Sequence, residues 1–251
     1  MNSQCTARDK RMQLNRDQLH VWLASLEVAS QQLGELERTL SADEVARAHR
    51  FYFERDRRRF IAAHGLLRAI VASYFEAAPS AVRFSYNEFG KPRLEGSQEI
   101  RDLNFNLSHS GGLALVAVAL ARDVGVDIET IDDSVRTEEV AKSFFSANEI
   151  AALAGLPQSL RLTGFFNCWT RKEAYIKARG MGLSIALNSF DVSLNPGERA
   201  DLIRTRNSSA ISNWKIENLE IDARHAAAIA AAGCNWKVAR WNWQPGVRMV
   251  G

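Results

Sequence analysis

The sequence predicts an α/β (α+β) fold that uses one unit twice, a long helix followed by three antiparallel strands. The first observation is that residues 60–75 and 165–178 carry apolar side chains at helical spacing. The second is that three segments with strand character follow each of these helices. The third is size, because 251 residues suffice for two small units that share a core.

The first elements lead from a strand into a basic helix. Residues 20–26 alternate weakly and predict the strand, and Ser41 with Glu44 has the spacing of a capping box that opens a helix. The most basic part of the chain follows, with Arg47, His49, Arg50, Arg55, Arg57, Arg58 and Arg59. These groups either pair locally with Glu54 and Asp56 on a solvated helix face or, in part, bind phosphate.

The core helix at residues 60–75 comes next, and His64 is expected to pack within it rather than to act in catalysis. A strand at residues 82–86 and a turn at Gly90-Lys91-Pro92 follow. The chain is then expected to continue through a loop into the next strand.

Residues 104–112 (NFNLSHSGG) predict a strand that ends in a polar, glycine-rich turn, and residues 113–121 return as a buried strand. Ser108, His109 and Ser110 are then gathered at one loop. Hydroxyl groups, an imidazole and the bare N–H groups of the two glycines are all donors, so this loop could bind phosphate. A plain hairpin turn with satisfied polar groups is the alternative.

Residues 124–131 (VGVDIETI) predict a buried strand, along which residues two positions apart point to the same face. Asp127 and Glu129 then stand side by side. Two buried anions repel each other unless a cation lies between them. A hard divalent ion such as Mg²⁺ binds carboxylate oxygens, so a metal site is one interpretation, and a strand end whose acids face water is the other.

The second half repeats the pattern. Residues 146–149 (SANE) have the spacing of another capping box, and residues 165–178 predict a strong helix that ends at the glycines of 180–182. Within this helix Glu173 and Lys177 are four positions apart, for which an exposed ion pair is the ordinary explanation.

Three further strands are predicted, at residues 189–194, 214–221 and 225–232. The last segment is rich in alanine, which favours a helix by propensity. The repeated order of elements decides for a strand, because a helix and three strands then occur in both halves.

Composition excludes several classes of protein. The longest apolar run, residues 113–121, is far shorter than the roughly 20 residues that a bilayer requires, and residues 1–19 lack the apolar region of a secretory signal. We therefore expect a cytoplasmic protein with no membrane partner. Three cysteines without metal-ligand spacing do not indicate zinc. The net charge of +3 suits polyanionic ligands but does not indicate nucleic acid, so no nucleic-acid partner is expected.

Five short motifs occur in one order along residues 47–190: GKP, N-x-S-H-S, VGVDIE, FFS-x-x-E and W-x-x-KE-x-x-x-K-x-x-G-x-G. Together they resemble the 4′-phosphopantetheinyl transferases, specifically the surfactin-synthetase-activating type. The resemblance implies a pseudo-twofold α/β monomer of the holo-[acyl-carrier-protein] synthase type. It implies Mg²⁺-dependent transfer of 4′-phosphopantetheine from coenzyme A to a conserved serine of an acidic apo acyl or peptidyl carrier protein, with release of adenosine 3′,5′-bisphosphate.

The resemblance also implies roles for individual residues. Three carboxylates would hold the metal: Asp127, Glu129 and Glu173. Basic and polar groups would bind coenzyme A: Arg47, Arg55, Arg59, Lys91, Ser108, His109 and Lys177. Glu173 and Lys177 would be catalytic, with Glu173 as the base for the serine hydroxyl and Glu149 in reserve. Residues 1–123 would form the N-terminal half on the nucleotide side, and residues 124–251 the C-terminal half with the metal and the catalytic groups, with the site at their interface.

A mildly basic, partly apolar segment is the predicted docking surface for the carrier protein: Arg136, Lys142, Phe144, Phe145 and Leu153. The sequence departs from the family pattern in the first dozen residues and in the tail from Trp241. It also departs at Phe60, near where relatives place a small polar residue beside adenine.

Two other classes of function stay open at this point. A Mg²⁺-dependent nuclease could use the acids of residues 127–129 with Glu173 and Lys177, although such sites usually have E-x-K on a strand. An RNA-binding module could use the arginines and aromatic residues of segment 47–59, but it would leave the paired acids unexplained and would bind with steep salt dependence.

Overall fold

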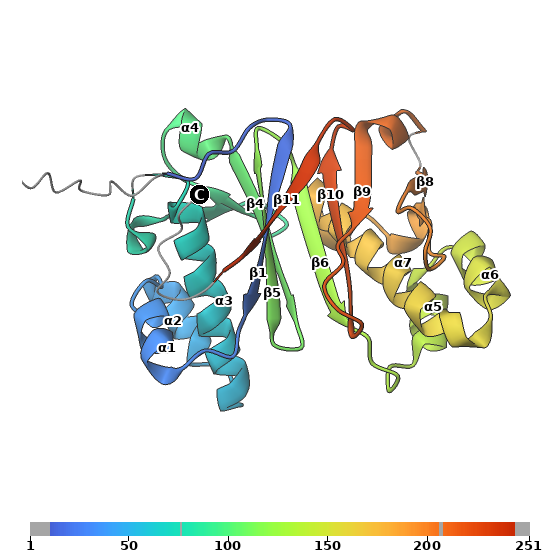
Figure 1. The fold of residues 1–251 in the computed structure, drawn as a ribbon, viewed down its shortest axis with the longest axis horizontal. Coiled ribbons are helices and arrows are strands. Elements are labelled where there is room, and N and C mark those ends of the chain that lie inside the picture. Colours follow the sequence, from blue (N-terminus) through green and yellow to red (C-terminus); the bar gives the residue numbers. More distant parts are fainter. Residues whose placement is uncertain (1–10, 76, 206–207, 244–251) are drawn as a thin grey trace, which may run out of the picture.

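The computed structural model describes residues 11–75, 77–205 and 208–243, and it contains two halves that lie side by side (Figure 1). The first half contains β1 (Gln18–Ser25), α1 (Ser30–Glu37), α2 (Ala42–Ala48), α3 (Glu54–Ala72), η1 (Pro79–Ala81), β2 (Phe84–Tyr86), β3 (Pro92–Leu94), α4 (Gln98–Arg101), β4 (Leu103–Ser110) and β5 (Leu113–Leu120). The second half contains β6 (Val124–Thr130), α5 (Thr137–Phe144), α6 (Ala147–Gly155), α7 (Gln158–Arg179), η2 (Gly182–Ser184), η3 (Leu187–Ser189), β7 (Asp191–Val192), β8 (Leu202–Arg204), η4 (Ser208–Asn213), β9 (Trp214–Asn218) and β10 (His225–Ala232). The strand β11 (Lys237–Asn242) follows.

The two halves repeat one topology, as the sequence predicts. In the first, β1, α3, the hairpin β2–β3, β4 and β5 follow one another, and the sheet order is β1-β5-β4. In the second, β6, α7, the hairpin β7–β8, β9 and β10 follow one another, and the sheet order is β6-β10-β9. The α+β fold class is therefore confirmed.

The strands that form each sheet differ from the prediction, in which the three strands after each long helix form one sheet. The first predicted strand of each set pairs into a separate two-stranded hairpin, and each sheet instead contains the strand that precedes its helix, β1 or β6. The segment of β2 is largely exposed, so it has no apolar face to bury in the main sheet. Asp127 and Glu129 consequently lie on the first strand of the second unit.

The last strand leaves the second half. β11 pairs in parallel with β1, with Gln18 opposite Lys237 and Leu23 opposite Asn242. In Figure 1, β11 (red) lies next to β1 (dark blue) at the edge of the first sheet. The tail from Trp241 thus begins within a strand of the first half's sheet, and Trp241 stacks on Trp22.

Apolar side chains of the described residues form three clusters that define layers. One lies between α3 and the first sheet and another between α7 and the second sheet. The third lies between the two sheets and includes Val21, Leu115, Val126 and Ile229. Because β5 and β10 are covered on both faces, they are almost continuously apolar. The first five residues of β6 are buried as well, and they include Asp127. The alanine-rich segment is β10, which confirms the strand prediction.

Helix ends follow local signals. Capping boxes at Ser41 and Ser146 are present as predicted, and α7 ends at Gly180 in the left-handed conformation, with φ of 64°. Both long helices begin earlier than predicted, α3 at Glu54 and α7 at Gln158. Their first turns are largely exposed, so the apolar spacing marks only the part of each helix that packs on a sheet. No helix in the described ranges has the length and apolar character needed to cross a bilayer.

Candidate active site between the two halves

The strands β4 and β6 belong to different sheets but are joined by side chains. The amide oxygen of Asn106 accepts from the backbone N–H of Val126 at 2.9 Å, and Ser110 Oγ accepts from the N–H of Thr130 at 3.1 Å. Between them, Ser108 Oγ accepts from the N–H of Ile128 at 3.4 Å. Alternate polar side chains of β4 therefore occupy the positions at which a neighbouring strand would offer carbonyl groups.

The same serines hold the two adjacent carboxylates of β6. Ser108 Oγ donates to Asp127 Oδ1 at 2.9 Å, and Ser110 Oγ donates to Glu129 Oε2 at 3.0 Å. The prediction that Ser108, His109 and Ser110 lie at a loop is wrong, because all three lie on β4, and the turn follows at Gly111.

Ser110 was predicted only as one of the groups that could bind phosphate at a loop, and its contact with Glu129 was missed. The signal that could have found it is the period of two in NFNLSHS, which puts the side chains of Asn106, Ser108 and Ser110 on one face of the strand. Extension of the strand through residue 110 would have aligned both serines with the acids of β6.

The helix α7 adds Lys177 and Glu173 to the site. Lys177 Nζ lies 2.5 Å from Asp127 Oδ1 and 3.0 Å from Ser108 Oγ. Lys177 therefore forms its ion pair across the fold, with Asp127, which departs from the ordinary explanation of a surface pair with Glu173. The close approach of α7 depends on Gly125, where an added Cβ would lie 2.2 Å from the backbone N of Ala178.

Three carboxylates influence one another in this region. Burial raises the pKa of Asp127, although Lys177 and Ser108 oppose the shift. Burial and the charge of Asp127 raise the pKa of Glu129 and also that of Glu173, and Glu173 adds to the effect on Glu129. The anions are thus close enough to destabilise one another, and a cation among them would relieve the repulsion.

The donor set fits a divalent cation. Asp127 Oδ2 is buried and has no hydrogen-bond partner among the described groups. Carboxylate oxygens are the ligands that Mg²⁺ prefers. As they stand, no three Asp, Glu, His or Cys side chains in the described ranges are grouped closely enough to hold an ion. Lys177 binds one oxygen of Asp127, and Ser110 binds one oxygen of Glu129.

A pocket of about 240 Å³ opens beside these groups, at the boundary between the halves. Its lining includes Phe89, Lys91 and Asn106 from the first half and Glu173, Lys177 and Gly180 from the second. The Lys91 ammonium is turned to the main chain, where it donates to Val124 O at 3.2 Å and to Ala178 O at 2.7 Å. Burial lowers the pKa of Lys91 to about 8.

The predicted nucleotide-binding groups are not all gathered in one place. Arg59 lies next to the turn after β4, since a Cβ on Gly112 would be 3.2 Å from its guanidinium, and it pairs with Glu27 at 2.6 Å. Desolvation of the ring, together with the positive charges of Lys177 and Arg59, lowers the pKa of His109, so these two side chains lie near enough to act on it.

The remaining arginines have local partners. Arg47 lies over the ring of the buried Phe60, 5.2 Å from its centroid, and His64 stacks on the same ring. Arg55 pairs with the adjacent Asp56, and its side chain is 69% exposed. Local pairing on a helix face is thus the better interpretation for Arg55. His64 is packed, as expected.

Glu149 is committed to the fold. One oxygen accepts from the backbone N–H of Ser146 and pairs with the buried Lys172 at 2.8 Å, and the other accepts from the N–H of Val192 at 2.9 Å. Both carboxylate oxygens therefore have structural partners. Glu149 has no free oxygen with which to act as the reserve base.

The predicted docking segment is only partly available. Arg136, Lys142 and Phe144 are exposed on or beside α5, whereas Phe145 and Leu153 are buried in the core of the second half. The two buried side chains cannot contact a partner without unfolding, so the apolar part of this surface reduces to Phe144 with its neighbours.

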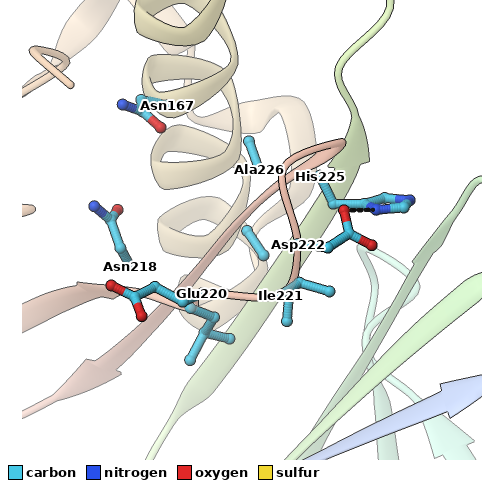
Figure 2. Close-up of a pocket in the computed structure, with 9 residues that line it drawn as sticks. Asn167, Asn218, Glu220, Ile221, Asp222, His225 and Ala226 are labelled. Carbon is cyan, nitrogen blue, oxygen red and sulfur yellow. Dashed lines mark hydrogen bonds and ion pairs between the residues drawn. The ribbon is translucent and has the colours of Figure 1, made fainter. Parts of the chain in front are cut away.

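A larger hollow, of about 340 Å³, lies at the hairpin between β9 and β10 and contains none of the predicted site residues. Figure 2 shows Asn167 of α7 across this hollow from Asn218, and Asp222 pointing toward the His225 ring. The Asp222 carboxylate is 2.8 Å from His225 Nδ1. This pair closes the hairpin, and nothing in it resembles the carboxylate cluster between the halves.

Comparison with known proteins gives a separate family match for each half of the chain. Residues 123–230 match the 4′-phosphopantetheinyl transferase superfamily, and residues 26–121 match the N-terminal region of 4′-phosphopantetheinyl transferases. The chain is 40% identical over 227 residues to 4′-phosphopantetheinyl transferase HetI of Nostoc sp., with 90% of this chain and 93% of that protein covered. It is 30% identical over 193 residues to 4′-phosphopantetheinyl transferase Sfp of Bacillus subtilis, with 77% and 82% covered.

A eukaryotic protein shows the same likeness. Over 206 residues the chain is 29% identical to the L-aminoadipate-semialdehyde dehydrogenase-phosphopantetheinyl transferase of Xenopus laevis, with 77% of this chain and 68% of that protein covered. The matches thus include both halves and the boundary where the carboxylates lie.

Proposed function

Because the chain belongs to the 4′-phosphopantetheinyl transferase superfamily, whose members modify carrier proteins with coenzyme A, we propose that it moves 4′-phosphopantetheine from coenzyme A to a carrier serine. Adenosine 3′,5′-bisphosphate leaves, and the reaction depends on Mg²⁺. The observation that supports this most directly is the ion pair of Lys177 with Asp127 at the boundary between the halves, where Glu129 and Glu173 are both influenced by the charge of Asp127.

The substrate explains this choice of groups. A diphosphate diester carries negative charge on both phosphoryl groups, so its transfer depends mainly on positioning and on charge neutralisation. Asp127, Glu129 and Glu173 would hold the ion, which would neutralise charge on the diphosphate. Lys177 contacts the phosphates as a fixed positive charge, and Ser108 orients its ammonium through the 3.0 Å contact.

Glu173 is the proposed general base. It is half-buried, and its pKa is raised by burial and by Asp127, which makes it a stronger proton acceptor than an exposed glutamate. In this role Glu173 takes the proton of the incoming serine hydroxyl as oxygen attacks the β-phosphoryl group. Glu149, the reserve candidate for this role, has both oxygens engaged in structural contacts.

Coenzyme A is proposed to lie along the boundary between the halves. The pocket lined by Lys91, Asn106 and Lys177 receives part of the molecule, and His109 with Arg59 faces its phosphates. Arg47 lies over the ring of Phe60, on which His64 also stacks. Arg55, which is exposed and paired with Asp56, would at most attract the anion from a distance.

The carrier protein is proposed to be acidic and to dock beside α5. Arg136 and Lys142 provide positive charge there, and Phe144, with 42% of its surface exposed, provides an apolar contact. We further propose that the protein is a cytoplasmic monomer. The monomeric state is supported by the fact that one chain contributes groups from both halves to the site.

A transfer assay tests the proposal. The protein is incubated with coenzyme A, Mg²⁺ and a set of apo acyl and peptidyl carrier proteins, and mass spectrometry measures the phosphopantetheine increment on each carrier. We expect the increment on at least one carrier and none with Asp127→Ala. Absence of the increment on every carrier, together with cleavage of nucleic acid or salt-sensitive RNA binding, would instead favour a nuclease or an RNA-binding module.

A further inference from the structure

The C-terminal end of α7 is held by a turn from the other half of the molecule. Asn87 Nδ2 donates to Gly180 O at 2.7 Å, and Lys91 Nζ donates to Ala178 O at the same distance. The last carbonyl groups of a helix lack partners within the helix. The turn between β2 and β3 therefore supplies a cap for α7 from a distance of about ninety positions in sequence.

Asn87 performs two tasks with its two side-chain atoms. Its Oδ1 accepts from the backbone N–H groups of Phe89 at 3.0 Å and of Lys91 at 2.8 Å, which shapes the turn. Its Nδ2 reaches the helix. Because two partners are N–H groups and the third is a carbonyl group, the orientation of the amide is determined by the contacts.

Lys91 is fitted closely to the helix end. Gly180 has φ of 64°, and a Cβ at this position would lie 2.6 Å from Lys91 Cδ. Glycine is thus required both by the left-handed backbone and by the stem of Lys91. Lys91 Nζ also donates to Val124 O, so it joins the start of β6 to the end of α7.

The opposite side of the helix end is held against β6. At Gly125 an added Cβ would lie 2.3 Å from Ala174 O and 2.2 Å from Ala178 N, so the two backbones are in direct contact. Lys177 immediately precedes Ala178, and Glu173 immediately precedes Ala174. A shift of this helix end would therefore move both site residues relative to Asp127, and a misplacement of about 1 Å can cost 10²-fold in rate.

We propose that Asn87 and Lys91 are positioning residues for the transfer reaction, which fix α7 on β6 and thereby set Lys177 and Glu173 against Asp127. The inference rests on the proposed function. It assigns the Lys91 ammonium to the carbonyl groups of α7 and β6, whereas the family resemblance implies that Lys91 lines the coenzyme A site.

The decisive variant is Asn87→Asp. The carboxylate keeps an oxygen that accepts from the N–H groups of Phe89 and Lys91, so the turn is retained, whereas the donor to Gly180 O is replaced by an oxygen that repels it. We expect kcat for transfer to fall by about 10-fold or more, with the KM for coenzyme A changed by less than about 2-fold. Lys91→Met keeps an apolar side chain against Gly180 but removes the ammonium group. It should likewise lower kcat and leave the KM for coenzyme A nearly unchanged.

Two further measurements separate positioning from other effects. If both residues act through α7, the double variant Asn87→Asp/Lys91→Met should lose less than the product of the two single losses. Isothermal titration of coenzyme A without Mg²⁺ should give similar dissociation constants for wild type and both single variants. Glu88→Gln, an exposed neighbour in the same turn, is the matched control and should transfer at the wild-type rate.

The outcomes are distinguishable. If wild type and Glu88→Gln modify no carrier, the proposed function is wrong, and the positioning role that rests on it is wrong as well. If wild type transfers and both single variants keep wild-type kcat, the positioning role is overturned. A rise in KM and in the dissociation constant for coenzyme A, at unchanged kcat, would also overturn it and would return Lys91 to the substrate. Thermal unfolding shows whether each variant is folded under the assay conditions. If Asn87→Asp does not fold, the result for Lys91→Met decides the question.

Discussion

Lys177 of α7 and Asp127 of β6 form an ion pair, with Nζ 2.5 Å from Oδ1, and Ser108 from the other half contacts both groups. Three elements that are far apart in the sequence thus meet at one carboxylate. Its second oxygen is buried and has no hydrogen-bond partner among the described groups. This relationship leads to predictions about charge, metal dependence and stability.

Replacement of Asp127 should separate activity from stability. In Asp127→Asn a buried anion is removed, which also relieves the repulsion that raises the pKa of Glu129 and Glu173. Lys177 is partly exposed, so its ammonium group can be solvated when its partner is neutral. We expect transfer to be abolished, and the melting temperature without Mg²⁺ to be equal to or above that of wild type. Thermal unfolding in EDTA measures this, and a fall of several degrees would contradict the assignment of Asp127 to a metal.

Glu173→Gln tests the base. Glutamine keeps the size and one oxygen donor but loses charge and basicity, so Mg²⁺ affinity should fall moderately and kcat by about 10² or more. Titration of the rate with Mg²⁺ distinguishes the roles, because full recovery at high Mg²⁺ would make Glu173 a ligand only. Lys177→Ala is the comparison, and it should slow transfer with little change in metal affinity, since an ammonium group cannot bind Mg²⁺.

Ser110→Ala should weaken metal binding through Glu129. The serine hydroxyl orients the carboxylate at 3.0 Å and accepts from Thr130 N–H. Without it, we expect the Mg²⁺ concentration for half-maximal rate to rise by about 3- to 10-fold, with the rate largely restored at saturating metal. Ser85→Ala, at an exposed serine of β2, is the matched control and should leave the Mg²⁺ requirement unchanged.

His109→Ala tests the nucleotide end of the substrate. His109 shares its surroundings with Arg59 and Lys177, which suits the 3′-phosphate of coenzyme A. Coenzyme A binding should weaken more than dephospho-coenzyme A binding, as measured by titration calorimetry of both ligands. Equal losses for the two ligands would place His109 at the diphosphate instead.

Glu44 should make stability depend on pH. Burial would raise its pKa, but hydrogen bonds from His64, the Ser41 N–H and Arg68 lower it to about 2, below the ordinary 4.5. The folded state therefore gains stability above pH 4.5, on the order of 2–3 kcal/mol, and loses it as pH falls from 4.5 toward 2. Glu44→Gln should unfold more readily than wild type at pH 7, and the difference in urea denaturation should shrink over that range. Glu35→Gln, an exposed change in α1, should show no such trend.

Much of the architecture could be read from the sequence because it depends on local patterns. Apolar spacing predicted α3 and α7, capping boxes predicted the starts of α2 and α6, and the repeated order of elements predicted that the alanine-rich segment forms β10. The i and i+2 geometry of β6 also predicted that Asp127 and Glu129 share a face.

Only the tertiary structure decided which distant groups meet. Three contacts join residues that are 19 to 93 positions apart in the sequence: Ser110 with Glu129, Lys177 with Asp127, and Asn87 with the end of α7. Local propensity carries no information about contacts over such separations. The contacts of Glu149 with Ser146, Val192 and Lys172 could not be predicted from the sequence either. A glutamate that caps a helix and one that acts in catalysis can have the same sequence spacing. The sequence by itself determined the elements and the chemistry available, and packing of the two halves determined which of those groups share a site.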